Sequence, residues 1–234
     1  MRIRRRNTVP LSPNLIEAVR ALDVRPRERR WSSVTYCVLD AVWSIGISYD
    51  RHVVPAVRRV AAAAGDVEPV VSVMTLPASD PLPLSAFRDT YRTPDELVAV
   101  TTAHRTSSRS RVLKAETALR YADVLVEAGV DTLPDAAKAL EDFARVDEIS
   151  ARLRQIPGDG VRTGYFWMLV GDDDTLKLDR MILRFLKRHG TETGVAGAKD
   201  VLRALAAELT GTSNYRVTPW MVDHAIWNAE RARR

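Results

Sequence analysis

Residues 156–160, which read Ile-Pro-Gly-Asp-Gly, carry the clearest chemical signal in the chain. Two glycines separated by one residue can take backbone angles closed to other residues, and they leave room for an anion beside the main chain. The amides of Gly160, Val161 and Arg162 would then point outward at the start of a new helix, where the helix dipole favours negative charge. The pattern indicates a phosphate-binding turn between two helices, with an ordinary tight turn as the alternative.

Asp179 is the second candidate, because it stands where the next helical pattern, residues 179–189, begins. Taken alone, an aspartate at this place is most simply a helix N-cap. A fixed carboxylate also suits the cleavage of a glycosidic bond, where it stabilises positive charge on the sugar or activates a water molecule.

Together the two segments resemble the helix-hairpin-helix DNA glycosylase superfamily, the group of endonuclease III and the adenine and alkyl-base glycosylases. The family pattern is Leu-Pro-Gly-x-Gly-x-x-Thr-Ala, a gap, then an apolar residue, Asp, two residues, an apolar position, x and Arg. Residues 156–164 match it with Gly164 in place of Ala, and residues 178–184 match it as well. Weaker similarity extends to residues 33–60, 111–125 and 133–140.

The resemblance implies a DNA glycosylase with Asp179 as its catalytic carboxylate. The target nucleotide leaves the stack and enters a pocket before its N-glycosidic bond is hydrolysed. The residues assigned to the grip on the DNA backbone are Pro157, Gly158, Gly160, Val161, Arg162 and Thr163. Backbone contacts of this kind carry no sequence information, so the partner is double-stranded DNA in general. No cofactor and no metal is expected.

Arg162 departs from the pattern of the bifunctional members, which carry a lysine at the matching position. That lysine forms a Schiff base with the sugar. Arginine stays protonated and is a poor nucleophile, so base excision without strand cleavage by an enzyme amine is expected. Arg162 is then either a contact to DNA phosphate or base, or a solvated side chain.

Asp40, Tyr49 and Trp220 are weaker candidates for the base pocket or for the wedge that fills the gap in the duplex. Asp40 lies inside an apolar helical pattern, where a carboxylate needs partners. It either bonds a neighbouring segment or faces the pocket. Tyr49, or else Ile47, is the wedge candidate that the resemblance suggests, with simple packing as the alternative for Tyr49. Trp220 is the aromatic candidate near the end of the chain.

Helical periodicity runs through nearly the whole sequence, and no strand pattern competes with it. The helices predicted around the two motifs are 32–47, 111–128, 147–154, 162–170, 179–189 and 218–232. We therefore expect an all-α fold, a two-lobed helical bundle with a helix-hairpin-helix motif and a DNA-binding cleft between the lobes. The predicted division of this single glycosylase-like unit is a central lobe at 31–154, the hairpin at 153–164, and a second lobe of 1–30 and 165–234.

Composition limits the class of protein. The 234 residues, 46% of them hydrophobic, suffice for a real core, and the net charge of +5 permits nucleic-acid binding without establishing it. The single cysteine, Cys37, excludes an internal disulfide and a cysteine-ligated cluster. No apolar run reaches the ~20 residues that span a membrane. A cytoplasmic monomer is expected, associated with the nucleoid if the source is bacterial.

Two other classes stay open at this point. A non-catalytic DNA-binding module would need the hairpin alone, and a helical protein-interaction domain would need the match of both motifs to be accidental. The excised base is not indicated: oxidised or alkylated purines, mismatched bases and hypermodified phage bases all fit. The last group is included because one branch of the superfamily resembles phage-defence enzymes.

Overall fold

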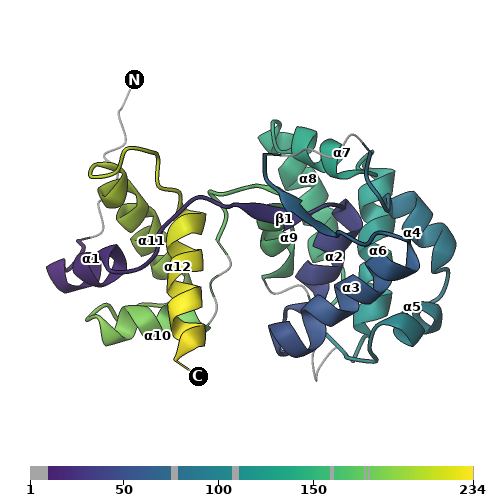
Figure 1. Ribbon diagram of the computed structural model, residues 1–234, viewed down its shortest axis with the longest axis horizontal. Helices are drawn as coiled ribbons and strands as arrows, with labels where there is room; N and C mark the ends of the chain where they lie inside the picture. Colours follow the sequence, from purple (N-terminus) through teal and green to yellow (C-terminus); the bar gives the residue numbers. More distant parts are fainter. Residues whose placement is uncertain are drawn as a thin grey trace. The chain divides into compact units, whose positions relative to one another are not determined.

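The computed structural model describes residues 10–74, 79–106, 111–158, 161–176, 178 and 180–233. Over these residues the chain is mostly helical, which confirms the helical class predicted from its periodicity. The chain divides into two compact units, shown in Figure 1. The central unit is Glu28–Asp172, and the terminal unit combines Met1–Arg27 with Asp173–Arg234.

The central unit holds two short strands, a π-helical turn and most of the helices. They are β1 (Arg29–Trp31), α2 (Val34–Trp43), η1 (Tyr49–Val53), α3 (Val54–Ala63), β2 (Val70–Ser72), α4 (Leu84–Thr90), α5 (Pro94–Val100), α6 (Lys114–Glu127), α7 (Leu133–Ala139), α8 (Phe143–Arg154) and α9 (Arg162–Val170).

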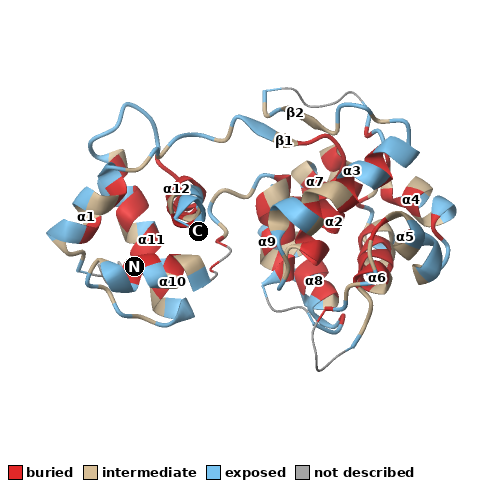
Figure 2. Ribbon diagram, turned by 60° about the horizontal axis from the view of Figure 1, so that its bottom comes forward, coloured by how far each residue is buried: buried red, intermediate tan, exposed pale blue. Residues whose placement is uncertain are grey.

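Helix α2 is the centre of this unit, and every one of its residues is buried (Figure 2). It packs against α3, α4, α6 and α9. Its sequence is apolar on nearly all sides, the pattern of a helix enclosed by others. Both of its ends are closed by charged side chains: the carboxylate of Asp80 accepts the amide of Val34 at 2.9 Å, and Lys114 meets the last carbonyls.

The strands correct the expectation of a purely helical chain. β1 and β2 pair antiparallel, with Arg30 opposite Val71. At three residues each they are too short for an alternating pattern to stand out in the sequence. The strand β1 leads directly into α2, and its Trp31 donates a hydrogen bond to Asp40 of that helix. The pairing with β2 therefore holds a second segment beside the start of α2.

The terminal unit consists of α1 (Pro13–Arg20), α10 (Arg180–Arg188), α11 (Val195–Thr210) and α12 (Pro219–Ala232). Helix α12 packs against the other three. It begins at the N-cap Thr218, whose side chain accepts the amide of Met221, and Pro219 occupies the first turn, where proline is favoured. In the described parts of the chain, no helix is long and apolar enough to cross a membrane.

The boundary between the units lies at Asp172 and Asp173, beyond the position expected from sequence. Helix α9 belongs to the central unit because its side chains pack on α2 and α8. Helix α8 is also longer than its predicted 147–154, since Asp142 caps it by accepting the amides of Ala144 and Arg145. The hairpin is thus held within one unit on both sides.

Candidate functional site

The candidate DNA grip is the turn between α8 and α9. Helix α8 ends in a tight turn, where the amide of Ile156 donates to the carbonyl of Leu153 at 3.1 Å. Gly158 follows with φ at 79°, the left-handed region that favours glycine. Pro157 and Gly158 are exposed, and Val161 is 37% exposed. Gly160 lies outside the described residues.

Arg162 lies beneath this turn and is only 1% exposed. Its Nε donates to the hydroxyl of Tyr121 at 3.1 Å, and one terminal nitrogen donates to the carbonyl of Ile156 at 3.1 Å. A weaker bond reaches the carbonyl of Pro157 at 3.4 Å. The guanidinium also lies over the Tyr121 ring, 4.9 Å from its centre. The solvated alternative for Arg162 is therefore wrong, and its observed partners belong to the protein.

Thr163 is buried as well, at 2% exposure. Its hydroxyl lies 2.9 Å from the hydroxyl of Tyr121, which thus connects both residues to α6. Of the six residues assigned to the grip, Pro157, Gly158 and Val161 are at the surface, while Arg162 and Thr163 support the turn from inside. A contact to DNA through this turn would use its main chain more than its side chains.

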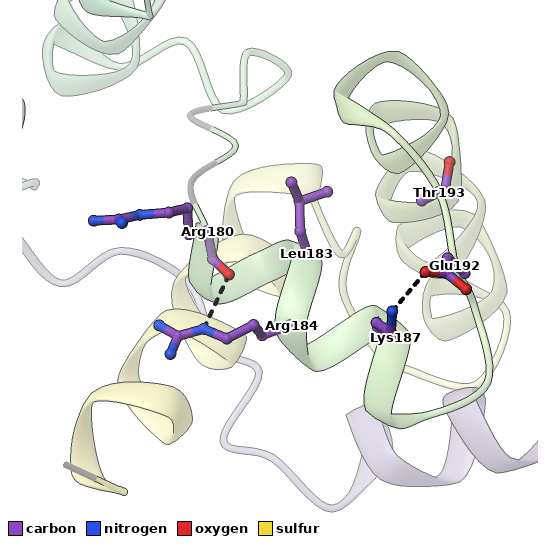
Figure 3. A pocket seen from close by; sticks show the side chains of 6 residues that line it. All are labelled: Arg180, Leu183, Arg184, Lys187, Glu192 and Thr193. Carbon is purple, nitrogen blue, oxygen red and sulfur yellow. Dashed lines mark hydrogen bonds and ion pairs between the residues drawn. The ribbon is translucent and has the colours of Figure 1, made fainter.

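Asp179, the candidate catalytic carboxylate, lies outside the described residues. Helix α10 begins at the next residue, Arg180. Its outer face forms one side of a hollow of about 440 Å³, shown in Figure 3. The residues that line the hollow are Arg180, Leu183, Arg184, Lys187, Glu192 and Thr193.

The charge of this hollow is mainly positive. Lys187 pairs with Glu192 at 2.6 Å, and the Nε of Arg184 donates to the carbonyl oxygen of Arg180 at 3.3 Å (Figure 3). Arg180 and Arg184 add two further cations one helical turn apart. The arrangement suits an anionic group more than a neutral ring.

Asp40 has no exposed surface and accepts hydrogen bonds from three side chains. Its Oδ2 accepts Trp31 Nε1 at 2.8 Å and the Tyr49 hydroxyl at 2.9 Å, and its Oδ1 accepts the Ser44 hydroxyl at 2.6 Å. Such a set of donors offsets the cost of burying the carboxylate. Asp40 ties β1, the end of α2 and η1 together, as the interpretation of a bond to neighbouring segments expected.

Tyr49, the wedge candidate, is half-buried, with its hydroxyl directed at Asp40. Tyr165 of α9 belongs to the same cluster. Burial, and after it the negative charge of Asp40, raises the pKa of Tyr165 well above its ordinary value. Its phenol therefore stays protonated at neutral pH and can act only as a neutral donor or acceptor. The cluster joins aromatic side chains around one buried carboxylate.

Trp220, the aromatic pocket candidate, is 7% exposed and lies in the terminal unit. The guanidinium of Arg27 lies over one side, 4.3 Å from the ring centre. The ring of His224 stacks against Trp220 at 4.7 Å between centroids, with an angle of 12° between the planes. Both neighbours are side chains of the same unit.

Two charged residues of the central unit were given no role from sequence. Lys114 is fully buried, and its Nζ donates to the carbonyls of Val42 and Ile45 at 2.8 Å each. Asp80 accepts the amides that begin α2 and α7, the latter through Leu133 at 2.7 Å. The bonds of Lys114 to the end of α2, and those of Asp80 to the starts of α2 and α7, join segments that are distant in the sequence, so no local motif marks them.

The comparison with known families places the chain. It belongs to the family described as a domain of unknown function, DUF8548, which matches residues 12–231. No curated protein and no solved structure matches the chain. The family description names no activity, so function has to be inferred from the residues described above.

Proposed function

We propose that this chain is a DNA-binding protein that grips a backbone phosphate with the α8–α9 turn and hydrolyses an N-glycosidic bond. Asp179 is the proposed carboxylate, stabilising positive charge on the sugar or activating the attacking water. The product is an abasic site in double-stranded DNA, formed by the monomer without cofactor or metal.

The geometry of the turn carries this proposal. Gly158 is exposed at positive φ, and α9 starts four residues later, at Arg162. The first amides of α9 have no acceptor within their own helix, a property of every helix N-terminus. The buried guanidinium of Arg162 donates to the carbonyls of Ile156 and Pro157. Two acceptors that would repel a phosphate are thereby occupied by a donor of the protein.

The positive face of α10 supports the same proposal. Arg180 follows directly on Asp179 in sequence, Arg184 lies one helical turn further on, and both line the hollow of Figure 3. A phosphate bound there would hold a strand close to the start of α10. Contacts of that kind add affinity for any sequence and weaken as salt concentration rises.

Asp179→Asn tests the catalytic role. Purified protein is incubated with duplexes that each carry one modified base, and alkali then reveals abasic sites. The variant should lose excision by at least about 100-fold, the usual contribution of such a group, and should bind duplex as the parent does. Asp172→Asn, an aspartate seven residues earlier in the chain, is the matched control. Excision by Asp179→Asn at the parental rate would end the assignment.

Borohydride trapping tests the absence of a Schiff base, because Arg162 replaces the lysine of the bifunctional pattern. A covalent protein–DNA adduct in the parent would contradict this part.

Non-catalytic duplex binding is the second candidate. One observation favours it: the partners described above for Arg162 and Thr163, which are Tyr121 and the carbonyls of Ile156 and Pro157, lie within the central unit. Binding of every duplex without excision of any base in the panel would select this candidate.

A further inference from the structure

The outer face of α12 carries an aromatic and cationic series. Trp220, His224, Trp227 and Arg231 are spaced by four, three and four residues, which puts them on one side of the helix. The apolar residues Val222, Ala225 and Ile226, all buried, occupy the opposite side and face the core of the terminal unit. Core packing therefore accounts for one side of α12 and leaves the other to be explained.

The side chains of this series are stacked along the helix. The guanidinium of Arg27 covers Trp220 at 4.3 Å, and the Trp220 and His224 rings are nearly parallel at 4.7 Å. The Trp227 ring follows at 6.2 Å from that of His224, with an angle of 13° between the planes. Arg231 ends the series, 4.9 Å from the centre of the Trp227 ring. We call these five residues the aromatic ladder.

The members of the ladder differ in how far they are exposed to solvent. Trp220 is buried, Trp227 is half-buried, and His224 and Arg231 are exposed. Desolvation, followed by the charges of Arg27 and Arg25, lowers the pKa of His224. Its ring is therefore neutral at neutral pH, so the accessible part of the ladder presents uncharged flat rings between guanidinium groups.

We propose that the aromatic ladder binds the unpaired bases of a single nucleic-acid strand. Every base has a flat π-face that can stack on the half-buried Trp227 ring in place of the exposed guanidinium of Arg231, which can then reach a neighbouring phosphate. Arg27, at the other end of the ladder, is held by Asp173 at 3.0 Å. The position of the rings on a rigid helix lowers the entropy cost of stacking. This activity goes beyond the proposed excision, because it requires neither Asp179 nor the α8–α9 turn.

The full-length chain is titrated with a fluorescent 15-mer of thymidylate and with an abasic strand of the same length, which has phosphates but no bases. The parent should bind the thymidylate strand on the order of fivefold or more tightly than the abasic strand, since one stacked base contributes at least about that factor. Trp227→Ala should remove this preference, whereas Trp227→Phe should retain most of it. Phe143→Ala is the matched control, because Phe143 is an aromatic residue at 84% exposure in the central unit.

Equal affinity of the parent for both strands would mean that the ladder contacts phosphates but no bases, and would overturn the proposal. Unchanged thymidylate affinity in folded Trp227→Ala would overturn it as well. So would a parent protein that binds vesicles of anionic lipid but neither strand. If Trp227→Ala lacks a cooperative unfolding transition, His224→Ala is used in its place, because His224 is exposed. The affinity of this variant for the thymidylate strand should fall below that of the parent. An affinity equal to that of the parent would contradict the proposal.

A parallel titration separates this proposal from that of the hairpin. Gly158→Val should weaken duplex binding and leave the preference for the thymidylate strand intact. Loss of both activities in folded Gly158→Val would mean that no separate strand site exists on α12.

Discussion

Arg162 shows how one buried cation can organise a surface. It uses Tyr121 on one side and the carbonyls of Ile156 and Pro157 on the other. A planar guanidinium serves this purpose because its donors point in several fixed directions, whereas an ammonium group is a compact point charge on a flexible stem. The choice of arginine over lysine thus has a structural reason, independent of any reaction with a sugar.

Arg162→Lys should lower the free energy of unfolding by about 1–3 kcal/mol, because a buried hydrogen bond to a charged donor is lost and carbonyls are left unsatisfied. Urea denaturation measures this loss. Arg154→Lys, an exposed position at the end of α8, is the control and should change little. Equal stability of Arg162→Lys and the parent would show that the three partners of Arg162 contribute nothing.

Asp40 illustrates the same principle with the opposite charge. Three of its donors come from β1, the end of α2 and η1, so one carboxylate fixes the relative positions of Trp31, Ser44 and Tyr49. A side chain bonded in this way is better suited to positioning its neighbours than to receiving a proton from a substrate. Any role of Tyr49 toward DNA would therefore depend on Asp40.

At the scale of elements, the α8–α9 turn depends on the backbone of Gly158. Its φ of 79° is strained for a residue with a Cβ atom. Gly158→Ala should therefore lower the free energy of unfolding by roughly 1 kcal/mol and weaken duplex binding for all sequences alike. Gly194→Ala is the matched control, because Gly194 has φ at −82° and an added Cβ meets nothing within 4 Å. A stability loss equal in both variants would contradict the special role of Gly158.

Helices α10 and α12 are joined by the ion pair of Arg188 and Glu230, with N–O distances of 2.5 and 2.9 Å. The hydrogen bonds from Arg188 lower the pKa of Glu230. A carboxyl with a lowered pKa in the folded state stabilises the fold above its unfolded pKa, about 4.3. This contribution is lost as the pH falls through the lowered folded value.

Glu230→Gln should accordingly lower the free energy of unfolding at pH 7 by about 1–3 kcal/mol, and the difference from the parent should shrink below about pH 4. Urea titrations at several pH values provide the measurement. Glu208→Gln, in the exposed pair with Arg20, is the control and should have a small effect at every pH. A difference that persists unchanged at acidic pH would exclude the ion pair as its cause.

At the scale of the whole molecule, the two units differ in how the chain builds them. The central unit is one continuous stretch with its own core around α2, whereas the terminal unit needs segments from both ends of the chain. The central unit can therefore assemble from one continuous segment, whereas the terminal unit requires the two ends of the chain to come together.

A fragment of residues 28–172 should fold alone, with helical circular dichroism and one cooperative urea transition. It should bind duplex DNA in a salt-dependent manner through the turn, and it should excise no base because Asp179 is absent from it. A fragment of residues 173–234 is the control and should not unfold cooperatively, since α1 is missing. A fragment 28–172 without a cooperative transition would show that the central core is insufficient.

The sequence by itself determined the features that depend on near neighbours along the chain. Thr93, with its Glu96 partner, and Thr218 are N-caps of the residue types that favour that position. Helix α6 ends before Gly129, which has φ at 71° as a helix-terminating glycine should. Such signals act within one helical turn, so the side chains involved are the nearest ones available and need no tertiary contact to be identified.

Only the tertiary structure decided where the charged side chains find their partners. Arg162 meets Tyr121 across 41 positions, Lys114 meets Val42 across 72, and Arg27 covers Trp220 although they lie near opposite ends of the chain. The pairing of β1 with β2 and the assignment of α9 to the central unit depend on similar long-range contacts. A buried charged side chain bonds to other groups of the protein, whereas an exposed one can contact an external partner. Whether a residue is buried depends on how the whole chain packs, so local sequence does not reveal it.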